Sequence, residues 1–147
     1  AEGRMILADA LAYSNELNPE LVIDAATLTG AAVAAIGQKA ACVMGNANQE
    51  IIDDLIKSGY NVHERLALMP FWDDYAEEVK SSIADLKNLG GKYAGSITAG
   101  KFLEHFVKSP YIHLDIAGPA FLDSVDNYKG KGGTGTGVRL LNNFLEN

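Results

Sequence analysis

The sequence predicts an α/β fold, because segments with helical spacing alternate with short apolar runs of strand length. Apolar residues in 4–17 recur at intervals of three and four, and Leu21-Val22-Ile23 follows closely as a short buried strand. Two further stretches have the length and composition of strands: the apolar run 40–44, and 111–116, in which apolar residues alternate with His113 and Asp115. Helices that alternate with buried strands are typical of this fold class.

The first predicted helix begins at Arg4 and ends in the polar stretch 15–19, which contains Pro19. Its apolar stripe consists of Leu7, Ala10, Leu11 and Leu17. The segment 24–30, with the sequence Asp-Ala-Ala-Thr-Leu-Thr-Gly, then follows the strand at 21–23. Open α/β sheets hold ligands at the carboxyl ends of their strands, so this segment is a candidate binding site.

The middle of the chain contains a second strand and a second amphipathic helix. Small residues in 31–36 allow another backbone to approach closely, and the strand at 40–44 is closed by Gly45-Asn46. The helix that follows is predicted to end at Ser58-Gly59, and its apolar face consists of Ile51, Ile52, Leu55 and Ile56. The segment 64–82 contains pairs of adjacent carboxylates, which could suggest a metal site. Adjacent residues on a helix do not face one another, so we interpret them as a solvated acidic face.

A glycine-rich loop at 87–95 leads into a third helix, for which Ser96 or Thr98 is the expected N-cap. The apolar stripe of this helix consists of Ala99, Phe102, Leu103 and Phe106. The strand at 111–116 ends at Gly118-Pro119. After the glycine-rich run 130–137, a last helix is predicted to carry Val138, Leu141 and Leu145.

Composition limits the class of protein. The chain has 147 residues, of which 48% are hydrophobic and 21% charged, as is usual for a globular domain. A formal net charge of −7 argues against nucleic-acid or anionic-membrane binding, which need clustered cations. Cys42 has no possible disulfide partner in the chain, which favours a reducing compartment. No signal peptide is visible within the chain, and we expect no membrane span in it, because no uncharged apolar run reaches about 20 residues.

Other motifs are weak. Gly130, Gly132 and Gly135 fit the G-x-G-x-x-G pattern, but a buried strand does not precede them, so a dinucleotide site is not expected. The three histidines are not spaced as a metal pair. His113 and Asp115 lie on the same face of their strand by period-two alternation, and we interpret them as members of a structural polar network.

Four stretches occur in an order that resembles a known family. Residues 1–4 (Ala-Glu-Gly-Arg), 24–30, 96–99 (Ser-Ile-Thr-Ala) and 113–118 (His-Leu-Asp-Ile-Ala-Gly) resemble the catalytic domain of the leucyl aminopeptidases, which are two-metal exopeptidases. The family signature reads Asn-Thr-Asp-Ala-Glu-Gly-Arg, and this chain begins at its Ala. The resemblance implies a partial three-layer α/β/α domain with a mixed central sheet, in which 1–147 are the C-terminal part of the catalytic domain.

The resemblance also implies roles for the first motif. Glu2 would bridge two divalent metal ions, Mn²⁺ or Zn²⁺, and a carboxylate suits this because it can bind both ions at once. Arg4 would be the catalytic residue that holds a bicarbonate ion. The planar guanidinium can form two parallel hydrogen bonds to a planar oxyanion, which an ammonium cannot.

By the same resemblance, five residues would contact the substrate. Leu28 would supply backbone contacts, Thr27, Thr29 and Gly30 would line the path of the peptide, and Ala99 would lie near the pocket for the N-terminal side chain. A pocket built of small residues would favour Leu-like side chains, because each buried CH₂ contributes ~0.8 kcal/mol.

The family's other metal ligands and its second catalytic residue lie upstream of the signature or in its Asn-Thr-Asp part, and they have no counterpart in 1–147. We therefore expect the parent protein to be a cytoplasmic, hexameric aminopeptidase that acts on peptides, and this chain alone to be inactive and to bind metal weakly. The alternative is a non-catalytic folded module that self-associates through its aromatic residues. These are Phe71, Trp72, Tyr75, Phe102 and Phe106.

Overall fold

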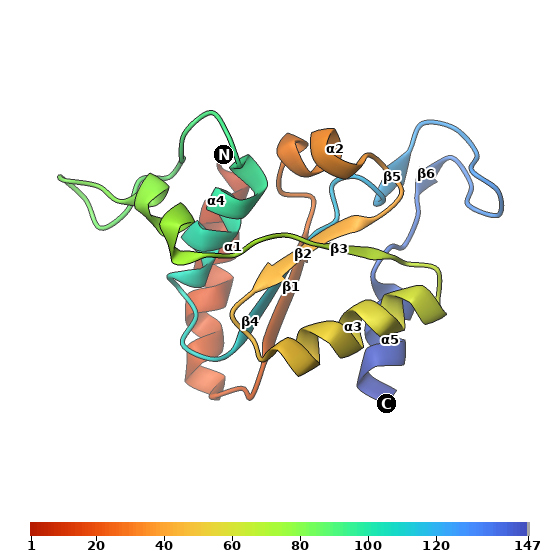
Figure 1. The fold of residues 1–147 in the computed structure, drawn as a ribbon, viewed down its shortest axis with the longest axis horizontal. Coiled ribbons are helices and arrows are strands. Elements are labelled where there is room, and N and C mark those ends of the chain that lie inside the picture. The colour runs from red at the N-terminus through yellow and green to blue at the C-terminus, as the bar shows by residue number, and fades with distance from the viewer. Residues whose placement is uncertain (147) are drawn as a thin grey trace.

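The centre of the molecule is a four-stranded mixed sheet (Figure 1). The computed structural model describes residues 1–146. The strands are β1 (Val22–Ala26), β2 (Ala41–Gly45), β3 (Leu66–Leu68) and β4 (Tyr111–Asp115). Their order across the sheet is β1-β4-β2-β3, with β1 parallel to β4, β2 parallel to β3, and β2 antiparallel to β4. The predicted α/β class is therefore confirmed, and the sheet is mixed.

Helices cover both faces of this sheet (Figure 1). They are α1 (Gly3–Ser14), α2 (Gly30–Ile36), α3 (Gln49–Asn61), α4 (Gly95–Glu104) and α5 (Val138–Glu146). Successive residues of a strand point to opposite faces, so Ile112 and Leu114 pack with α3 and α5, whereas Tyr111 packs with α1 and α4. A third cluster joins Ala32 of α2 to Cys42 and Met44. The layers are thus α/β/α.

Helix α1 has the predicted extent, and of its predicted stripe Leu11 is buried and Leu7 partly buried, as expected. It runs into a single 3-10 turn, η1 (Asn15–Leu17), and ends at Asn18, whose left-handed backbone (φ 48°) precedes Pro19. Ala10 and Leu17 were expected to be buried and are exposed. The buried residues are Arg4, Ala8 and Leu11. The tighter 3-10 turn rotates Leu17 out of the stripe.

Two predicted boundaries are wrong, and one helix was not predicted. β1 continues to Ala26, so Asp24 lies within the strand and not after it. The stretch 31–36 is helical, as α2. Helix α3 does not end at Gly59 but runs to Asn61. Gly59 is required for close packing, because a Cβ there would lie 2.6 Å from the carbonyl oxygen of Glu64.

The segment after α3 contains a strand that the sequence did not predict. β3 has only three residues, too few to show a period, and it forms one edge of the sheet. A 3-10 helix, η2 (Asp73–Val79), follows. The carboxylates at 73–74 and 77–78 are all exposed, so the predicted acidic face is confirmed.

The predicted capping of α4 is also wrong. Ala94, in a left-handed conformation (φ 53°), is the N-cap, and Ser96 and Thr98 lie buried inside the helix. The Thr98 hydroxyl donates to the carbonyl oxygen of Gly95 at 3.4 Å, while that of Ser96 donates to Asp115 on β4. The predicted stripe is buried or partly buried, as expected: Ala99, Phe102, Leu103 and Phe106.

Helix α5 follows a small hairpin of β5 (Phe121–Leu122) and β6 (Gly132–Gly133). Of the three residues predicted for its apolar face, Leu141 is confirmed, but Val138 and Leu145 are exposed. Leu140 is the buried residue. The rotation of the helix is set by Glu64, whose buried carboxylate accepts the N–H groups of Gly137 and Leu140 at 3.0 Å each.

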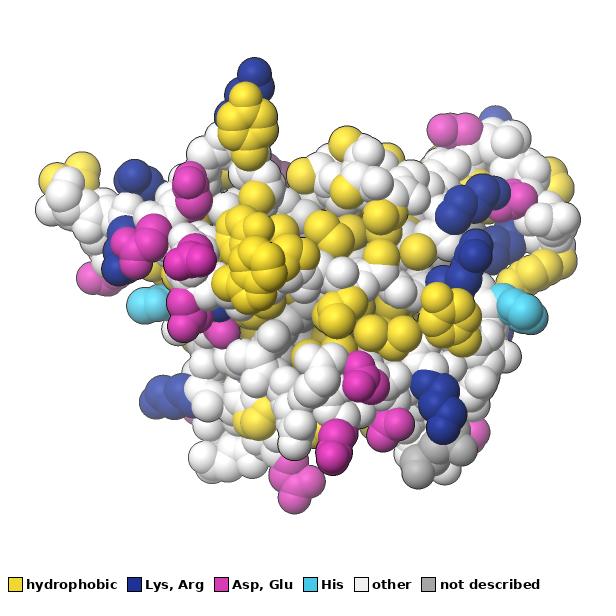
Figure 2. All heavy atoms as spheres, viewed as in Figure 1, with side chains coloured by type: hydrophobic (Ala, Val, Ile, Leu, Met, Phe, Trp, Pro, Cys, Tyr) yellow, Lys and Arg dark blue, Asp and Glu magenta, His cyan; other side chains and the backbone are white. Residues whose placement is uncertain are grey.

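Apolar and charged side chains are unevenly spread over the surface. Figure 2 shows an apolar area over β3 and the segment that follows it, which includes the exposed Leu68 and Trp72. Of the residues in the alternative docking set, Phe102 is buried in the core, whereas Trp72 is 64% exposed and stacks on Tyr75. Within 1–146, every helix is too short or too polar to cross a bilayer.

Candidate active site

The first motif lies at the start of α1. The side chain of Glu2 is 94% exposed, and its Oε2 lies 3.3 Å from the terminal ammonium of Ala1. A hydrogen bond from its own backbone N–H, together with this ammonium, lowers the pKa of the Glu2 carboxyl. Glu2 is therefore an ionised carboxylate that is open to a ligand.

Arg4 is placed differently, because only 6% of it is exposed. Its Nη1 donates to the carbonyl oxygen of Asn88 at 2.6 Å, and its guanidinium lies 5.7 Å from the ring centre of Phe102. Burial lowers the pKa of Arg4, although a guanidinium remains charged at neutral pH. Arg4 thus connects α1 to α4 and to the glycine-rich loop before it.

The second motif bridges the end of β1 and the start of α2. Thr29 is the N-cap of α2, and its Oγ1 accepts the N–H of Ala32 at 3.1 Å. The same hydroxyl donates to Oδ2 of Asp115 at 2.6 Å. The N–H groups of Leu28 and Thr29 donate to Oδ1 of Asp115 at 3.2 and 3.4 Å.

Asp115 is a fully buried carboxylate at the end of β4, and it joins the last three motifs. Besides the three donors from 28–29, it accepts the hydroxyl of Ser96 at 3.4 Å and the N–H of Ala117 at 3.2 Å. Five donors compensate for the loss of water around the buried charge. Asp115 thereby fixes the segment 28–29 relative to the first turn of α4.

The structure places the remaining predicted site residues as follows. Thr27 and Gly30 are exposed at either side of Leu28 and Thr29, and Leu28 packs into the core cluster that contains Phe102. Ala99 is entirely buried, so its side chain does not reach a surface of this chain. The N-terminus and the start of α4 lie at the same side of the molecule (Figure 1). The motifs therefore converge around α4, through Ser96 in its first turn and Phe102 near its end.

His113 belongs to a second buried network, as predicted. Its Nδ1 lies 2.9 and 3.0 Å from the two oxygens of Asp24, and the hydroxyl of Tyr111 donates to Asp24 Oδ2 at 2.5 Å. Burial, and then the nearby Asp24, raises the pKa of Tyr111. The structural role of both residues is confirmed, but His113 and Asp115 belong to two separate networks and not to one. Period-two alternation had placed His113 and Asp115 on one face, and Tyr111 was not predicted to join them.

Sequence reasoning missed two residues of this region. Asp115 was predicted only as part of a network, without its contacts to 28–29, and Asn88 was predicted only as part of a loop. Both contacts join residues more than 80 positions apart, so no local pattern signals them.

The candidate metal ligands of this region are few. Among residues 1–146, three or more His, Cys, Asp or Glu side chains do not gather in a group that could hold a metal ion. Two bound ions need several hard ligands, and Glu2 supplies one carboxylate. The residues present do not by themselves fit a two-metal site, and we derive no catalytic step through metal from them.

The fold and the site together define an α/β domain whose candidate ligand site lies at the carboxyl end of β1. Comparison with known proteins agrees with the family resemblance. Residues 1–142 match the model of the catalytic domain of the cytosol aminopeptidase family. The chain belongs to this family.

Individual relatives carry the same description. Proteins named "Probable cytosol aminopeptidase" are 52% identical in Chloroherpeton thalassium, 50% in Geobacter sulfurreducens and 45% in Neisseria meningitidis. The alignments cover 99–100% of this chain but only 29–31% of the relatives. The chain therefore spans about three tenths of the length of the curated relatives it matches.

Proposed function

We propose that the protein carrying this chain is a metal-dependent aminopeptidase that removes N-terminal residues from peptides. Residues 1–147 form the C-terminal part of its catalytic domain in this proposal. The observation that carries it is the 45–52% identity, over the whole chain, to proteins named as cytosol aminopeptidases. The same names support a cytoplasmic location, and we extend the proposal to the hexameric assembly implied by the leucyl aminopeptidase family.

Glu2 is proposed as a metal ligand that bridges two ions, Mn²⁺ or Zn²⁺. The largest cause of its lowered pKa, a hydrogen bond from its own backbone N–H, supports this role, because a metal ligand must be ionised. Bound metal would supply Lewis-acid activation of the peptide carbonyl or of water.

Arg4 is proposed to hold a bicarbonate ion. One of its N–H groups donates to the carbonyl oxygen of Asn88, and a guanidinium has five such donors, so others remain for an anion. The contact with Asn88 also restrains the side chain, which favours a defined position for a bound oxyanion.

The peptide is proposed to lie along Thr27, Leu28, Thr29 and Gly30, with Ala99 near the pocket for its first side chain. The hydrogen bonds from Leu28 and Thr29 to Asp115 support this, because they hold the segment in one conformation. The proposal includes a preference of the pocket near Ala99 for Leu-like N-terminal side chains.

The chain alone is proposed to be inactive. Hydrolysis of leucyl amide with Mn²⁺ should be measured for the 147-residue chain and for a protein extended upstream, together with calorimetric titration of Mn²⁺. The longer protein should bind two ions and turn over substrate, and the short chain should bind Mn²⁺ weakly and release no ammonia. Tight two-ion binding and turnover by the short chain would contradict the proposal.

A second candidate is a non-catalytic module that associates through its apolar surface. The 64% exposure of Trp72 beside the exposed Leu68 favours it. Sedimentation of the purified chain tests it: association that is lost in Trp72→Ser supports this candidate, and a monomer of 15.7 kDa contradicts it.

A further inference from the structure

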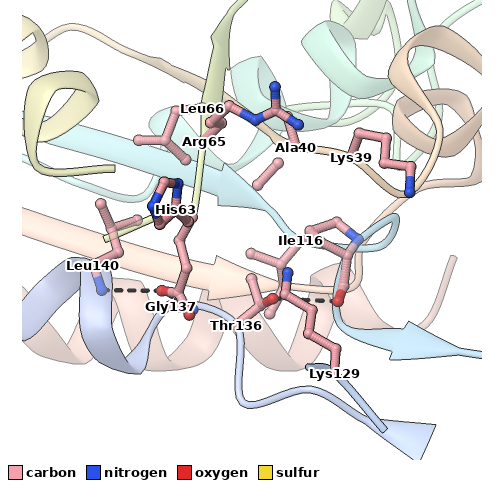
Figure 3. Close-up of a pocket in the computed structure, with 13 residues that line it drawn as sticks. Lys39, Ala40, His63, Arg65, Leu66, Ile116, Lys129, Thr136, Gly137 and Leu140 are labelled. Atoms are coloured by element: carbon pink, nitrogen blue, oxygen red, sulfur yellow. Dashed lines mark hydrogen bonds between the residues drawn. The ribbon is translucent and has the colours of Figure 1, made fainter. Parts of the chain in front are cut away.

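A cationic groove lies on the side of α2 away from the candidate active site. It has a volume of about 500 Å³ and adjoins a smaller cavity that shares four of its lining residues. These four are Lys39, His63, Arg65 and Lys129 (Figure 3). They come from three segments: the turn after α2, the turn after α3, and the loop between β5 and β6. The groove is therefore a product of the fold and not of one basic stretch.

The balance of charge in the groove is opposite to that of the whole chain. The chain has a formal net charge of −7, whereas the groove is lined by three permanently cationic side chains and by one carboxylate, Asp126. Lys39 Nζ lies 2.7 Å from Asp126 Oδ2, and this pairing is the largest cause that lowers the pKa of Asp126. One cation is thereby neutralised, and two are left.

The two remaining cations are available to a ligand. Across residues 1–146, the guanidinium of Arg65 makes no hydrogen bond, ion pair or ring contact, and Lys129 acts on Asp126 only at longer range. Figure 2 shows the dark blue side chains gathered at this end of the molecule. Tyr128 also lines the groove, and its hydroxyl accepts from Arg139 at 2.8 Å, which leaves the hydroxyl proton without a partner in that bond.

We propose that this groove binds a compact phosphate group that carries at least two negative charges. The planar fork of Arg65 can hold two oxygens of a tetrahedral phosphate, while Lys129 supplies a point charge. A single carboxylate would leave one of the two cations without a partner. The inference is independent of the aminopeptidase proposal, because none of the groove residues belongs to the candidate active site.

The test is calorimetric titration of the protein that carries this chain with pyrophosphate and, separately, with phenyl phosphate. The probe variant is Arg65→Gln with Lys129→Gln. The control is Lys57→Gln with Lys108→Gln, which removes the same charge from exposed positions outside the groove. Binding of phenyl phosphate as tight as that of pyrophosphate would indicate a phosphomonoester ligand, and tighter pyrophosphate binding an inorganic one.

We expect the probe variant to bind at least tenfold more weakly than the wild type and the control to stay within about twofold. Phosphate bound at a metal centre would bind both variants as tightly as the wild type, so the comparison isolates the groove. Equal affinities of the two variants, or no binding of either probe to the wild type at millimolar concentration, would overturn the proposal.

Discussion

The hydroxyl of Thr29 and the carboxylate of Asp115 are joined by a 2.6 Å hydrogen bond, although 86 positions separate them in the chain. The same hydroxyl accepts the N–H of Ala32 and so caps α2. One side chain thereby fixes both the start of a helix and its attachment to the sheet. Because Thr29 lies in the segment proposed to contact the peptide, this bond links the stability of the fold to the geometry of the site.

Replacing Asp115 by Asn should therefore impair activity and stability together. An amide has one acceptor oxygen and cannot satisfy donors on both sides as the carboxylate does. We expect a loss of about 1–3 kcal/mol in the free energy of unfolding and at least a tenfold fall in kcat/KM for leucyl amide. Urea unfolding and steady-state kinetics measure these quantities.

Thr29→Ser and Thr29→Val form a matched pair for the same contact. Serine keeps the hydroxyl and should retain most of the activity, whereas valine should lose about 0.5–2 kcal/mol of stability as a missing N-cap does. Equal activity in the two variants would show that the bond to Asp115 has no part in positioning the segment.

Glu64 should be a major determinant of stability. Its buried carboxylate accepts the N–H groups of Gly137 and Leu140, and the Nε–H of Arg139 at 3.3 Å. We expect Glu64→Gln to lower the free energy of unfolding by about 1–3 kcal/mol. The amide NH₂ group would take the place of one carboxylate oxygen and would face N–H groups that need an acceptor. The control is Glu77→Gln, whose exposed pair with Lys80 should contribute under about 0.5 kcal/mol. Similar unfolding curves for the two variants would contradict the role of Glu64.

The buried thiol of Cys42 should be protected from alkylation. Its ionisation should also make the free energy of unfolding fall as the pH rises into the alkaline range. Burial, with a smaller effect of Asp115, raises the pKa of its thiol to about 11. An unfolded thiol ionises near pH ~8.5, so the stability from this site is complete below that pH and is lost as the pH rises through about 11. Free energies of unfolding between pH 7 and 11 should fall less steeply for Cys42→Ala. Rapid alkylation by iodoacetamide in native protein at pH 8 would disagree with this burial.

The elements that could be predicted are those whose own sequence carries the pattern of a strand or a helix. The strands at 40–44 and 111–116 were predicted within a residue, because the first is a continuous apolar run and the second alternates apolar residues with His113 and Asp115. β3 was missed because three residues show no period, and its place comes from pairing with β2. The face of α5 was misassigned because Glu64, more than 70 positions earlier, sets its rotation.

In the candidate site, the identity of the residues could be predicted from sequence, but their arrangement in space could not. The motif residues could be identified from sequence because their order resembles a family, and the comparison with cytosol aminopeptidases confirms the family. Their arrangement could not be predicted, because it depends on contacts from Asp115 to Leu28 and from Arg4 to Asn88 across the fold. Ser96 was predicted as a helix cap, but a buried carboxylate attracts its hydroxyl instead.

The most direct test of the proposed function is the substitution Glu2→Gln in the protein that carries this chain, with Mn²⁺ or Zn²⁺ supplied. An amide cannot bridge two cations as a carboxylate does, and the Glu2 carboxylate accepts no hydrogen bond from residues 3–146 that the substitution would remove. The proposal predicts that turnover of leucyl amide falls by at least a thousandfold, roughly 4 kcal/mol, with an unchanged unfolding midpoint. Wild-type turnover in Glu2→Gln would contradict it.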